Sequence, residues 1–424
     1  MTRFSWDRQP VSRRSILAAG GVGAAALALA ACGSNTGRSS GGGDGTTLKQ
    51  WYHAYGEDGV EDAVKKFAAD YKDATVEVSW IDGYDDQLGA ALLKADQAPD
   101  VYEAQPTISR QKAGHMSDVT DLINADKEDW VQNTLDAYEI DGKYWGIPQA
   151  VDMQMLVYRP SMLKEAGFSE APKSVDELVE IAKATTKGNV KGLFVGNDGG
   201  PGVFATPAIY AAGLTMLNAD HKDVGFNDPQ AAAVLTKLKE LRTNGSLLLG
   251  APTDWSDPGA ISNGLCAMQW TGLWTFPQLK EALKDDFAVA GFPAFGPSGK
   301  AAVPFGAYHS IAYGKGKNVE ASKDFIKWLW VDQTDKQLEF QTKFGFHIPP
   351  RKSLAEKAEA LKSGPAADAV KLYQENGYHT GPYWTDPMSK AFSDAATNIL
   401  TKDADAQTEL QTAIATIKAE LGKN

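Results

Sequence analysis

The sequence predicts an α/β protein of two domains built on a parallel sheet. Short apolar runs alternate with amphipathic helical segments from residue 47 onward, which is the pattern of βαβ units. Without its first 31 residues the 424-residue chain still has 393, a length that favours two domains over one. A hydrophobic content of 43% and a charged content of 23% are ordinary for a globular body.

The first 32 residues resemble an export signal and are left out of the fold. The segment 12–17 reads Ser-Arg-Arg-Ser-Ile-Leu and resembles the twin-arginine signal, and the weakly apolar run 16–31 follows it. This run is too short and too poor in strongly apolar side chains for a lasting membrane helix. It ends in Leu-Ala-Ala-Cys-Gly at 29–33, which resembles a lipobox, so we expect Cys32 to carry a lipid. The alternative is an ordinary signal peptide with an incidental cysteine.

Residues 33–47 are predicted to form a flexible tether. The stretch is rich in Gly and Ser and has almost no apolar side chain to bury. It would let a folded body move above a membrane that the chain touches only through its lipid.

The body opens with a predicted βαβαβ unit. Strands are expected at 47–52, at 75–81 and from 99, with helices at 60–71 and 85–96 between them. Ligands of open parallel sheets lie beyond the carboxyl ends of the strands. Those ends carry the sequences His-Ala-Tyr-Gly, Asp-Gly-Tyr and Glu-Ala-Gln, so the predicted rim is aromatic and hydrogen-bonding.

A second unit is expected after the turn at 141–148. It begins with a strand at 153–158 and continues through helices at 175–185 and 230–242. A further strand is expected at 304–313 and a helix at 319–331. The terminal stretch 388–421 is helical and amphipathic.

Composition excludes several classes of function. A formal net charge of −12 argues against nucleic acid and anionic lipid surfaces as partners. The second cysteine, Cys266, has no partner if Cys32 is lipidated, so we expect it to be a small buried residue. No phosphate loop, His-Glu-x-x-His or Gly-x-Ser-x-Gly motif occurs, and the glycine-rich loop 196–202 is read as a turn. The sequence therefore predicts no cofactor, no metal site and no catalytic residue.

Four segments in order resemble one known family. The stretch 141–167, from Asp-Gly-Lys-Tyr-Trp-Gly-Ile-Pro onward, closely resembles the hinge region of extracellular solute-binding proteins of family 1, the maltose-binding type. The segment 267–274 resembles the Met-x-x-x-Gly-x-Trp element of that family, 305–312 its returning strand, and 346–353 its Pro-x-Arg-x-Ser turn. The resemblance covers the body from Leu48 onward.

The resemblance implies a periplasmic-binding-protein fold with two α/β lobes, several hinge crossings and a ligand cleft between the lobes. Lobe 1 is then expected to comprise residues 48–150 and 307–347, and lobe 2 residues 151–306 and 348–424. It also implies a monomeric binding protein on the extracellular face of the cell membrane, which captures a sugar by lobe closure and delivers it to ABC transporter permease subunits.

The resemblance also implies ligand-binding positions. It places an acidic ligand at Asp152, stacking rings at Trp274 and Trp384, and polar contacts at His53 and Tyr55. The chain departs from the family with Leu273 in place of a frequent proline and with the pair Tyr308 and His309, which leaves the sugar unidentified. A sugar ring has an apolar face and a belt of hydroxyls, so its site needs flat aromatic surfaces beside donors and acceptors. On that chemistry we add further candidates: Gln105, Trp270, Tyr308, His309 and Tyr383.

Two other functions stay open at this point. A secreted glycan-degrading lipoprotein would need two carboxylates about 5 to 10 Å apart, and four residues could supply them: Asp85, Asp86, Glu103 and Asp152. The same fold could instead bind a peptide, a polyol phosphate or another small solute. An anionic solute would call for Arg or Lys in the cleft, and the predicted rim has few.

The lipid anchor is directly testable. Cys32→Ala should abolish lipid labelling and release the folded protein from the membrane, because one thioether-linked lipid is the expected means of attachment. Metabolic labelling with a fatty-acid analogue, followed by membrane fractionation, measures both. A Cys32→Ala protein that folds and stays in the membrane fraction would contradict the lipoprotein interpretation.

Overall fold

The computed structural model describes residues 45–197 and 199–423. The predicted export signal, Cys32 and most of the tether lie outside the described residues. The first strand begins at Thr47, one residue inside the predicted tether. Within the described part of the chain, no helix is both long and apolar enough to cross a membrane.

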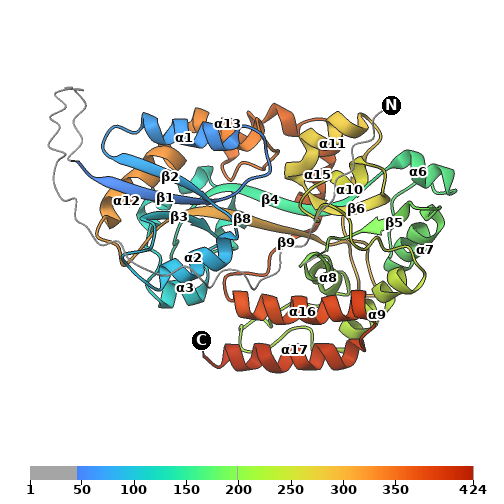
Figure 1. Ribbon diagram of the computed structural model, residues 1–424. Helices are drawn as coiled ribbons and strands as arrows, with labels where there is room; N and C mark the ends of the chain where they lie inside the picture. Colours follow the sequence, from blue (N-terminus) through green and yellow to red (C-terminus); the bar gives the residue numbers. More distant parts are fainter. Residues whose placement is uncertain (1–44, 198, 424) are drawn as a thin grey trace, which may run out of the picture. The chain divides into compact units, whose positions relative to one another are not determined.

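Helices and strands are mixed along the described chain (Figure 1). The strands are β1 (Thr47–His53), β2 (Thr75–Ile81), β3 (Val101–Ala104), β4 (Ile147–Tyr158), β5 (Lys191–Phe194), β6 (Cys266–Gly272), β7 (Ala288–Ala290), β8 (Val303–Ala312) and β9 (Gly377–Tyr378). The helices before β6 are α1 (Val60–Asp70), α2 (Tyr84–Leu92), α3 (Ile108–Lys112), α4 (Thr120–Asn124), α5 (Gln132–Asp136), α6 (Pro160–Glu165), α7 (Val175–Thr185), α8 (Gly200–Ala211), α9 (Pro229–Thr243) and α10 (Gly259–Ser262). Those after β6 are α11 (Phe276–Leu283), α12 (Val319–Lys327), α13 (Thr334–Thr342), α14 (Lys352–Ala355), α15 (Gly364–Asn376), α16 (Asp386–Lys402) and α17 (Ala406–Leu421).

The predicted βαβαβ unit is confirmed. Strand β1 pairs in parallel with β2 on one side, in register from Thr47 opposite Thr75, and with β3 on the other. Helices α1 and α2 make the two crossovers, as parallel neighbours require. The carboxyl ends of β1 and β3 therefore lie at the same edge of the sheet.

Two long strands, β4 and β8, lie at the centre of the strand order β2-β1-β3-β8-β4-β6-β5. They pair antiparallel, with Asp152 opposite Gly306 and Ala150 opposite Tyr308. Strand β4 begins at Ile147, six residues before the predicted start, because the segment read as a turn continues directly into the strand. Pro148 is tolerated there beside an irregularity in the register, a position where a missing N–H costs little.

The buried residues of the described chain form four hydrophobic clusters. Two clusters draw only on residues 48–150 and 311–340, and include the buried rings of Tyr52, Tyr102 and Trp330. A third draws only on residues 156–302 and 384–417, and includes Phe204 and Trp270. The fourth joins residues 137–138 to residues 151–307 and 348–373, so it extends across both groups. The separation of the other three clusters fits the two-lobe fold. The proposed lobe boundaries at 150/151 and 306/307 fall inside β4 and β8, which continue unbroken, so they stay predictions of where the lobes meet.

The structure refines three local predictions. The stretch 388–421 is helical, as predicted, and comprises two helices, because Asp403 adopts a left-handed conformation with φ of 67° and separates α16 from α17. The helix predicted at 319–331 ends as regular helix at Lys327 and continues as a wider turn to Asp332. The predicted turn at 196–202 gives way at Gly200 to the first residues of α8.

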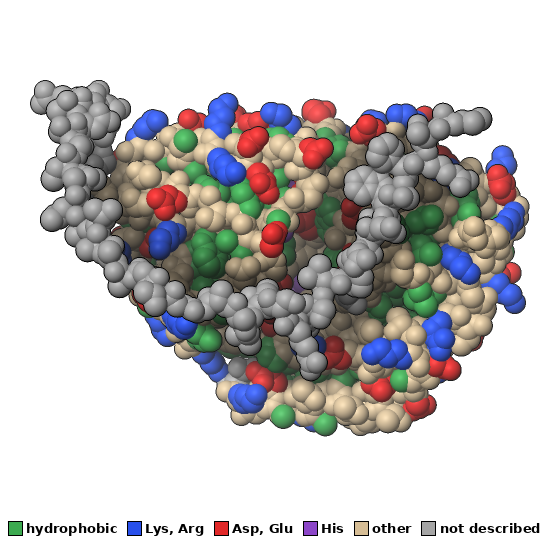
Figure 2. All heavy atoms as spheres, viewed as in Figure 1, with side chains coloured by type: hydrophobic (Ala, Val, Ile, Leu, Met, Phe, Trp, Pro, Cys, Tyr) green, Lys and Arg blue, Asp and Glu red, His purple; other side chains and the backbone are tan. Residues whose placement is uncertain are grey.

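The surface of the described residues is mixed in charge. Lys, Arg, Asp and Glu side chains are interspersed over the face in Figure 2. Among all described residues, the exposed large hydrophobic side chains are Leu93 and Leu249. Cys266 is a free, fully buried thiol, as predicted, and burial raises its pKa.

Candidate functional site

A cavity of about 670 Å³ lies beside the central strands. Its wall is formed by the segment after β1, by residues of β4 and β8, and by loops before α10, α11 and α16. This volume is within the usual range for small-molecule sites, about 300 to 1,000 Å³. The position agrees with the expectation that ligands lie beyond the carboxyl ends of parallel strands.

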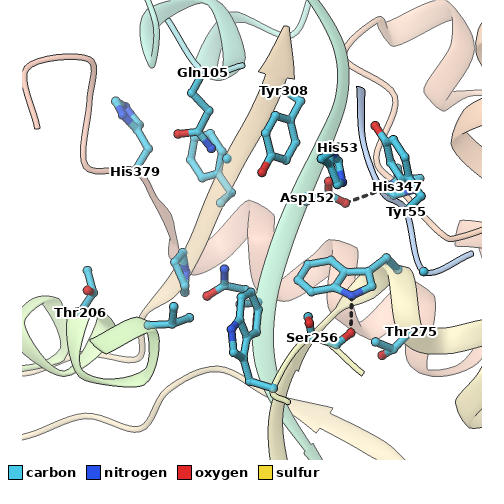
Figure 3. Close-up of a pocket in the computed structure, with 18 of the residues that line it drawn as sticks. His53, Tyr55, Gln105, Asp152, Thr206, Ser256, Thr275, Tyr308, His347 and His379 are labelled. Carbon is cyan, nitrogen blue, oxygen red and sulfur yellow. Dashed lines mark hydrogen bonds and ion pairs between the residues drawn. The ribbon is translucent and has the colours of Figure 1, made fainter. Parts of the chain in front are cut away.

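Most of the predicted site residues come together in this cavity. Seven of them line it: His53, Tyr55, Gln105, Asp152, Trp274, Tyr308 and Trp384. They lie far apart in the sequence. Figure 3 shows Asp152 and Tyr308 on the neighbouring strands β4 and β8, with His53 from β1 close to them. Trp384 contributes little ring surface, because it is 8% exposed and packs edge-on against Phe226 in the core.

Three predicted residues lie elsewhere. Trp270 is completely buried between the rings of Phe204 and Phe292, so its size serves core packing. His309 faces the opposite side of β8 from the cavity and bonds through Nδ1 to the Ala307 carbonyl, 2.8 Å away. Tyr383 stacks on His221 at 4.2 Å and does not line the cavity. Neighbouring side chains of a strand point to opposite faces, which explains why His309 points away from the cavity that Tyr308 lines.

Two tryptophans form an aromatic wall on one side of the cavity. Trp274 meets Trp255 edge to face, with ring centroids 5.7 Å apart, and its indole N–H donates to the Ser256 carbonyl at 2.9 Å. The indole ring of Trp274 lies across Gly272, where a Cβ would come within 1.9 Å of the ring. Glycine at 272 is therefore what lets the ring lie flat against the strand end.

A buried glutamine holds the loop that carries Trp255. The side chain of Gln269 accepts from the backbone N–H of Ile261 at 3.0 Å and donates to the Asp257 carbonyl at 2.8 Å. Because Gln269 is completely buried on β6, these bonds fix the loop to the sheet.

A second group of aromatic side chains surrounds a buried carboxylate. The Tyr55 hydroxyl donates to Glu103, and His53 Nδ1 lies 2.6 Å from the other oxygen of the same carboxylate. The ring of Tyr308 stacks on His53 with centroids 5.0 Å apart. Burial lowers the pKa of His53, but the Glu103 carboxylate outweighs this effect, and the pKa lies above its ordinary value of 6.5. When it is protonated, the His53 imidazole compensates the charge of Glu103, which is 1% exposed.

Gln105 and Asp152 present polar groups to the cavity beside one glycine. Gly306 is the register partner of Asp152, and a Cβ at Gly306 would lie 2.6 Å from Gln105 Nε2. The absence of a side chain at 306 therefore makes room for the amide next to the carboxylate.

Asp152 is held by a histidine that the sequence analysis did not select. His347 Nδ1 lies 2.6 Å from Asp152 Oδ1 (Figure 3). Its Nε2 lies 3.4 Å from Glu57 Oε1. Burial alone would lower the pKa of His347, but the two carboxylates, Asp152 before Glu57, raise it to about 10.

Several cavity residues were missed from the sequence: Glu57, Gln154, Trp255, Asp257, His347, Tyr378 and His379. Trp255 had a usable signal, because a tryptophan in a loop rich in Pro, Asp and Gly belongs to no periodic core pattern. No sequence signal marked His347 or Glu57 as site residues, because only the fold brings them beside Asp152.

The carboxylates suggested for glycan cleavage are not gathered in the cavity. Of the four, Asp152 lines it, while Glu103 is buried behind Tyr55 and His53, and neither Asp85 nor Asp86 is part of the wall. Among the described residues that line the cavity there is no Lys or Arg. No group of three or more described His, Cys, Asp or Glu side chains is arranged to hold a metal ion.

Comparison with known proteins agrees with this geometry. A family described as bacterial extracellular solute-binding protein matches residues 62–369, well over half of the chain. The chain belongs to this family of solute-binding proteins. Its predicted family and two-lobe α/β fold are thereby confirmed.

Relatives of this solute-binding protein include two of nearly full length. The diacetylchitobiose binding protein DasA of Streptomyces coelicolor is 26% identical over 84% of this chain and 86% of its own. The maltooligosaccharide ABC transporter solute-binding lipoprotein of Streptococcus pneumoniae is 26% identical over 94% of both chains.

Solved structures share the fold at low sequence identity. An ABC transporter solute-binding protein from Thermotoga lettingae, bound with α-D-tagatose, superposes with a TM-score of 0.75 at 19% identity over 89% of this chain and 100% of its own. The maltotriose binding protein of Thermus thermophilus gives a TM-score of 0.71 at 21% identity, over 88% of this chain and 100% of its own.

The raised pKa of His347 predicts a pH-dependent contribution to stability. The folded pKa of about 10 lies above the ordinary value of 6.5, so the charged ring stabilises the fold fully below pH 6.5. This stabilisation is lost as the pH rises toward 10. The difference in unfolding free energy between wild type and His347→Gln should therefore shrink between pH 7 and 9, by up to about 1.4 kcal/mol per pH unit. Urea unfolding at each pH measures it.

His309 supplies the matched control, because burial lowers its pKa to about 3. Its ring is neutral in folded and unfolded protein above pH 7, so the difference between wild type and His309→Gln should stay constant from pH 7 to 9. A constant difference for His347→Gln as well would contradict a charged His347.

Proposed function

We propose that the cavity binds a saccharide and that the protein delivers it to the permease of an ABC importer. The observation that carries this proposal is the wall of Trp274 and Trp255 in a cavity that also holds the polar groups of Gln105, Asp152 and Gln154. Flat rings suit the C–H face of a sugar, and fixed donors and acceptors suit its hydroxyls.

The electrostatics of the cavity support an uncharged ligand. Its described wall has carboxylates at Glu57, Asp152 and Asp257 and no Lys or Arg. An anionic solute would meet like charges without the guanidinium or ammonium groups that bind such ligands. The polyol phosphate alternative is disfavoured on this ground.

The names of the relatives point the same way. Besides the diacetylchitobiose and maltooligosaccharide proteins, the arabinooligosaccharide-binding protein of Bacillus subtilis is 22% identical over 71% of this chain. All three names refer to an oligosaccharide, and we extend that ligand class to this protein.

The remaining features of the proposal concern location and assembly. We place the protein on the extracellular face of the cell membrane, attached through a lipid on Cys32 after export by the twin-arginine route. It would act as a monomer, consistent with the scarcity of large exposed hydrophobic side chains among the described residues. Closure of lobes 48–150 with 307–347 and 151–306 with 348–424 would enclose the sugar and signal its capture to the permease.

A binding protein should return its sugar unchanged. Incubation with maltotriose, mannotriose, laminaribiose and diacetylchitobiose should give saturable binding in titration calorimetry and no new reducing ends in chromatography. The physical reason is that, of the four carboxylates considered for cleavage, only Asp152 lines the cavity. Reproducible hydrolysis that is lost in Asp152→Asn would instead establish a glycosidase.

Trp274 should matter for affinity and Trp270 for stability. Trp274→Ala removes a half-buried ring of the cavity wall, so the affinity for the bound saccharide should fall by about 2 to 4 kcal/mol, roughly thirtyfold to a thousandfold. Trp270→Ala empties a core position and should reduce the unfolding free energy by about 3 to 5 kcal/mol. Calorimetric titration and thermal unfolding without ligand measure the two effects.

Trp270→Ala is a matched control for Trp274→Ala, because both variants remove an indole ring and the two positions lie four residues apart in the segment 267–274. Unfolding of unliganded Trp274→Ala at a much lower temperature, with unchanged affinity in the folded fraction, would place Trp274 in the core and refute the stacking role.

A further inference from the structure

The imidazole of His347 lies between two carboxylates at the wall of the cavity. Its side chain is 4% exposed, that of Glu57 is 7% exposed, and that of Asp152 is 23% exposed. The two nitrogens face different partners, Nδ1 toward Asp152 and Nε2 toward Glu57. A neutral imidazole has one N–H, whereas the doubly protonated ring has two and can donate to both carboxylates.

The backbone around His347 is tied to the strand that carries Asp152. Val151 and Ile348 exchange two hydrogen bonds of 2.9 Å each, so residues 347 and 152 are fixed side by side. The backbone N–H of His347 donates to the Gln341 carbonyl at 2.9 Å, and its ring stacks on Phe340 with an angle of 15° between the planes. The ring is thus fixed on its own segment, independently of the carboxylates.

The neighbouring glycine makes room for this arrangement. A Cβ at Gly345 would lie 2.7 Å from Glu57 Oε1 and 3.1 Å from His347 Nε2. The segment therefore accommodates the Glu57 carboxylate and the His347 ring only because residue 345 lacks a side chain.

One oxygen of Asp152 is occupied and the other is available. Oδ1 is bonded to His347, and Oδ2 has no hydrogen-bond partner among the described residues. The carboxylate also lies next to Gly306 and the amide of Gln105, on the cavity side of β4.

We propose that His347 is a positioning residue of the saccharide site: its doubly protonated ring, backed by Glu57, fixes Asp152 so that Oδ2 accepts a hydrogen bond from a ligand hydroxyl. The inference rests on the proposed function, because it assigns the hydroxyl to a saccharide. A carboxylate held in this way loses less rotational freedom when the ligand binds.

The titratable groups around the ring are consistent with its charge. Asp152 comes from β4 and Glu57 from the loop after β1, and both raise the pKa of His347 against the opposing effect of burial. Burial lowers the pKa of His53, on β1, but Glu103 raises it more, and Glu57 and Asp152 add smaller contributions in the same direction. Helix α13 contributes the uncharged ring of Phe340.

A double-mutant cycle tests the coupling. Asp152→Asn should weaken binding of the best ligand among maltotriose, mannotriose, laminaribiose and diacetylchitobiose by about tenfold or more. His347→Gln should weaken it by a similar factor in the wild-type background, yet by less than about twofold in Asp152→Asn, because its effect passes through Asp152. Titration calorimetry at pH 7.5 gives all four affinities.

The control is His309→Gln, a buried histidine of the same fold that does not line the cavity. Its effect on affinity should be small and equal in both backgrounds. An equal loss for His347→Gln in both backgrounds would show a general structural role and overturn the proposal.

A second measurement needs neither a ligand nor a folded variant. Nitrogen-detected NMR of the imidazole groups in the unliganded wild-type protein should show both nitrogens of His347 protonated at pH 8, where an ordinary histidine is neutral. A neutral His347 at pH 8 would overturn the proposal. If none of the four saccharides binds the wild type, the proposed function fails, whatever the charge of His347.

Discussion

The antiparallel pairing of β4 with β8 is the constraint on which the rest of the structure depends. These two strands contribute residues to several core clusters, and each also carries residues that line the cavity. Their register sets Asp152 opposite Gly306, with Tyr308 two residues further along β8. A slip of one residue would turn these side chains to the opposite face and remove them from the cavity.

Glycine controls close approach at the cavity wall. Gly272 leaves space for the Trp274 ring, Gly306 for the amide of Gln105, and Gly345 for Glu57 and His347. In each case a Cβ would collide with a cavity side chain, so the reason for the glycine is steric space for a neighbour. None of the three has a positive φ.

Buried carboxylates are tolerated here because each has a donor. Glu103 is satisfied by Tyr55 and His53, and Asp152 by His347. Removing such a partner leaves a buried charge uncompensated, which costs far more than the pair contributes. This explains why residues that touch no ligand directly can still decide whether the cavity keeps its shape.

The sequence alone determined the family, the βαβαβ unit and seven of the residues that line the cavity, because hydrophobic periodicity and short motifs are local properties. It could not separate Trp274 from Trp270, since both lie in one motif and differ only in what packs around them. It also could not find Glu57 and His347, which meet only through the pairing of Val151 with Ile348 and the path of the loop after β1. The burial of a side chain, its charge and its partners all depend on the neighbours that the tertiary structure places around it. For that reason only the fold decided which residues face the cavity and which histidine carries a charge.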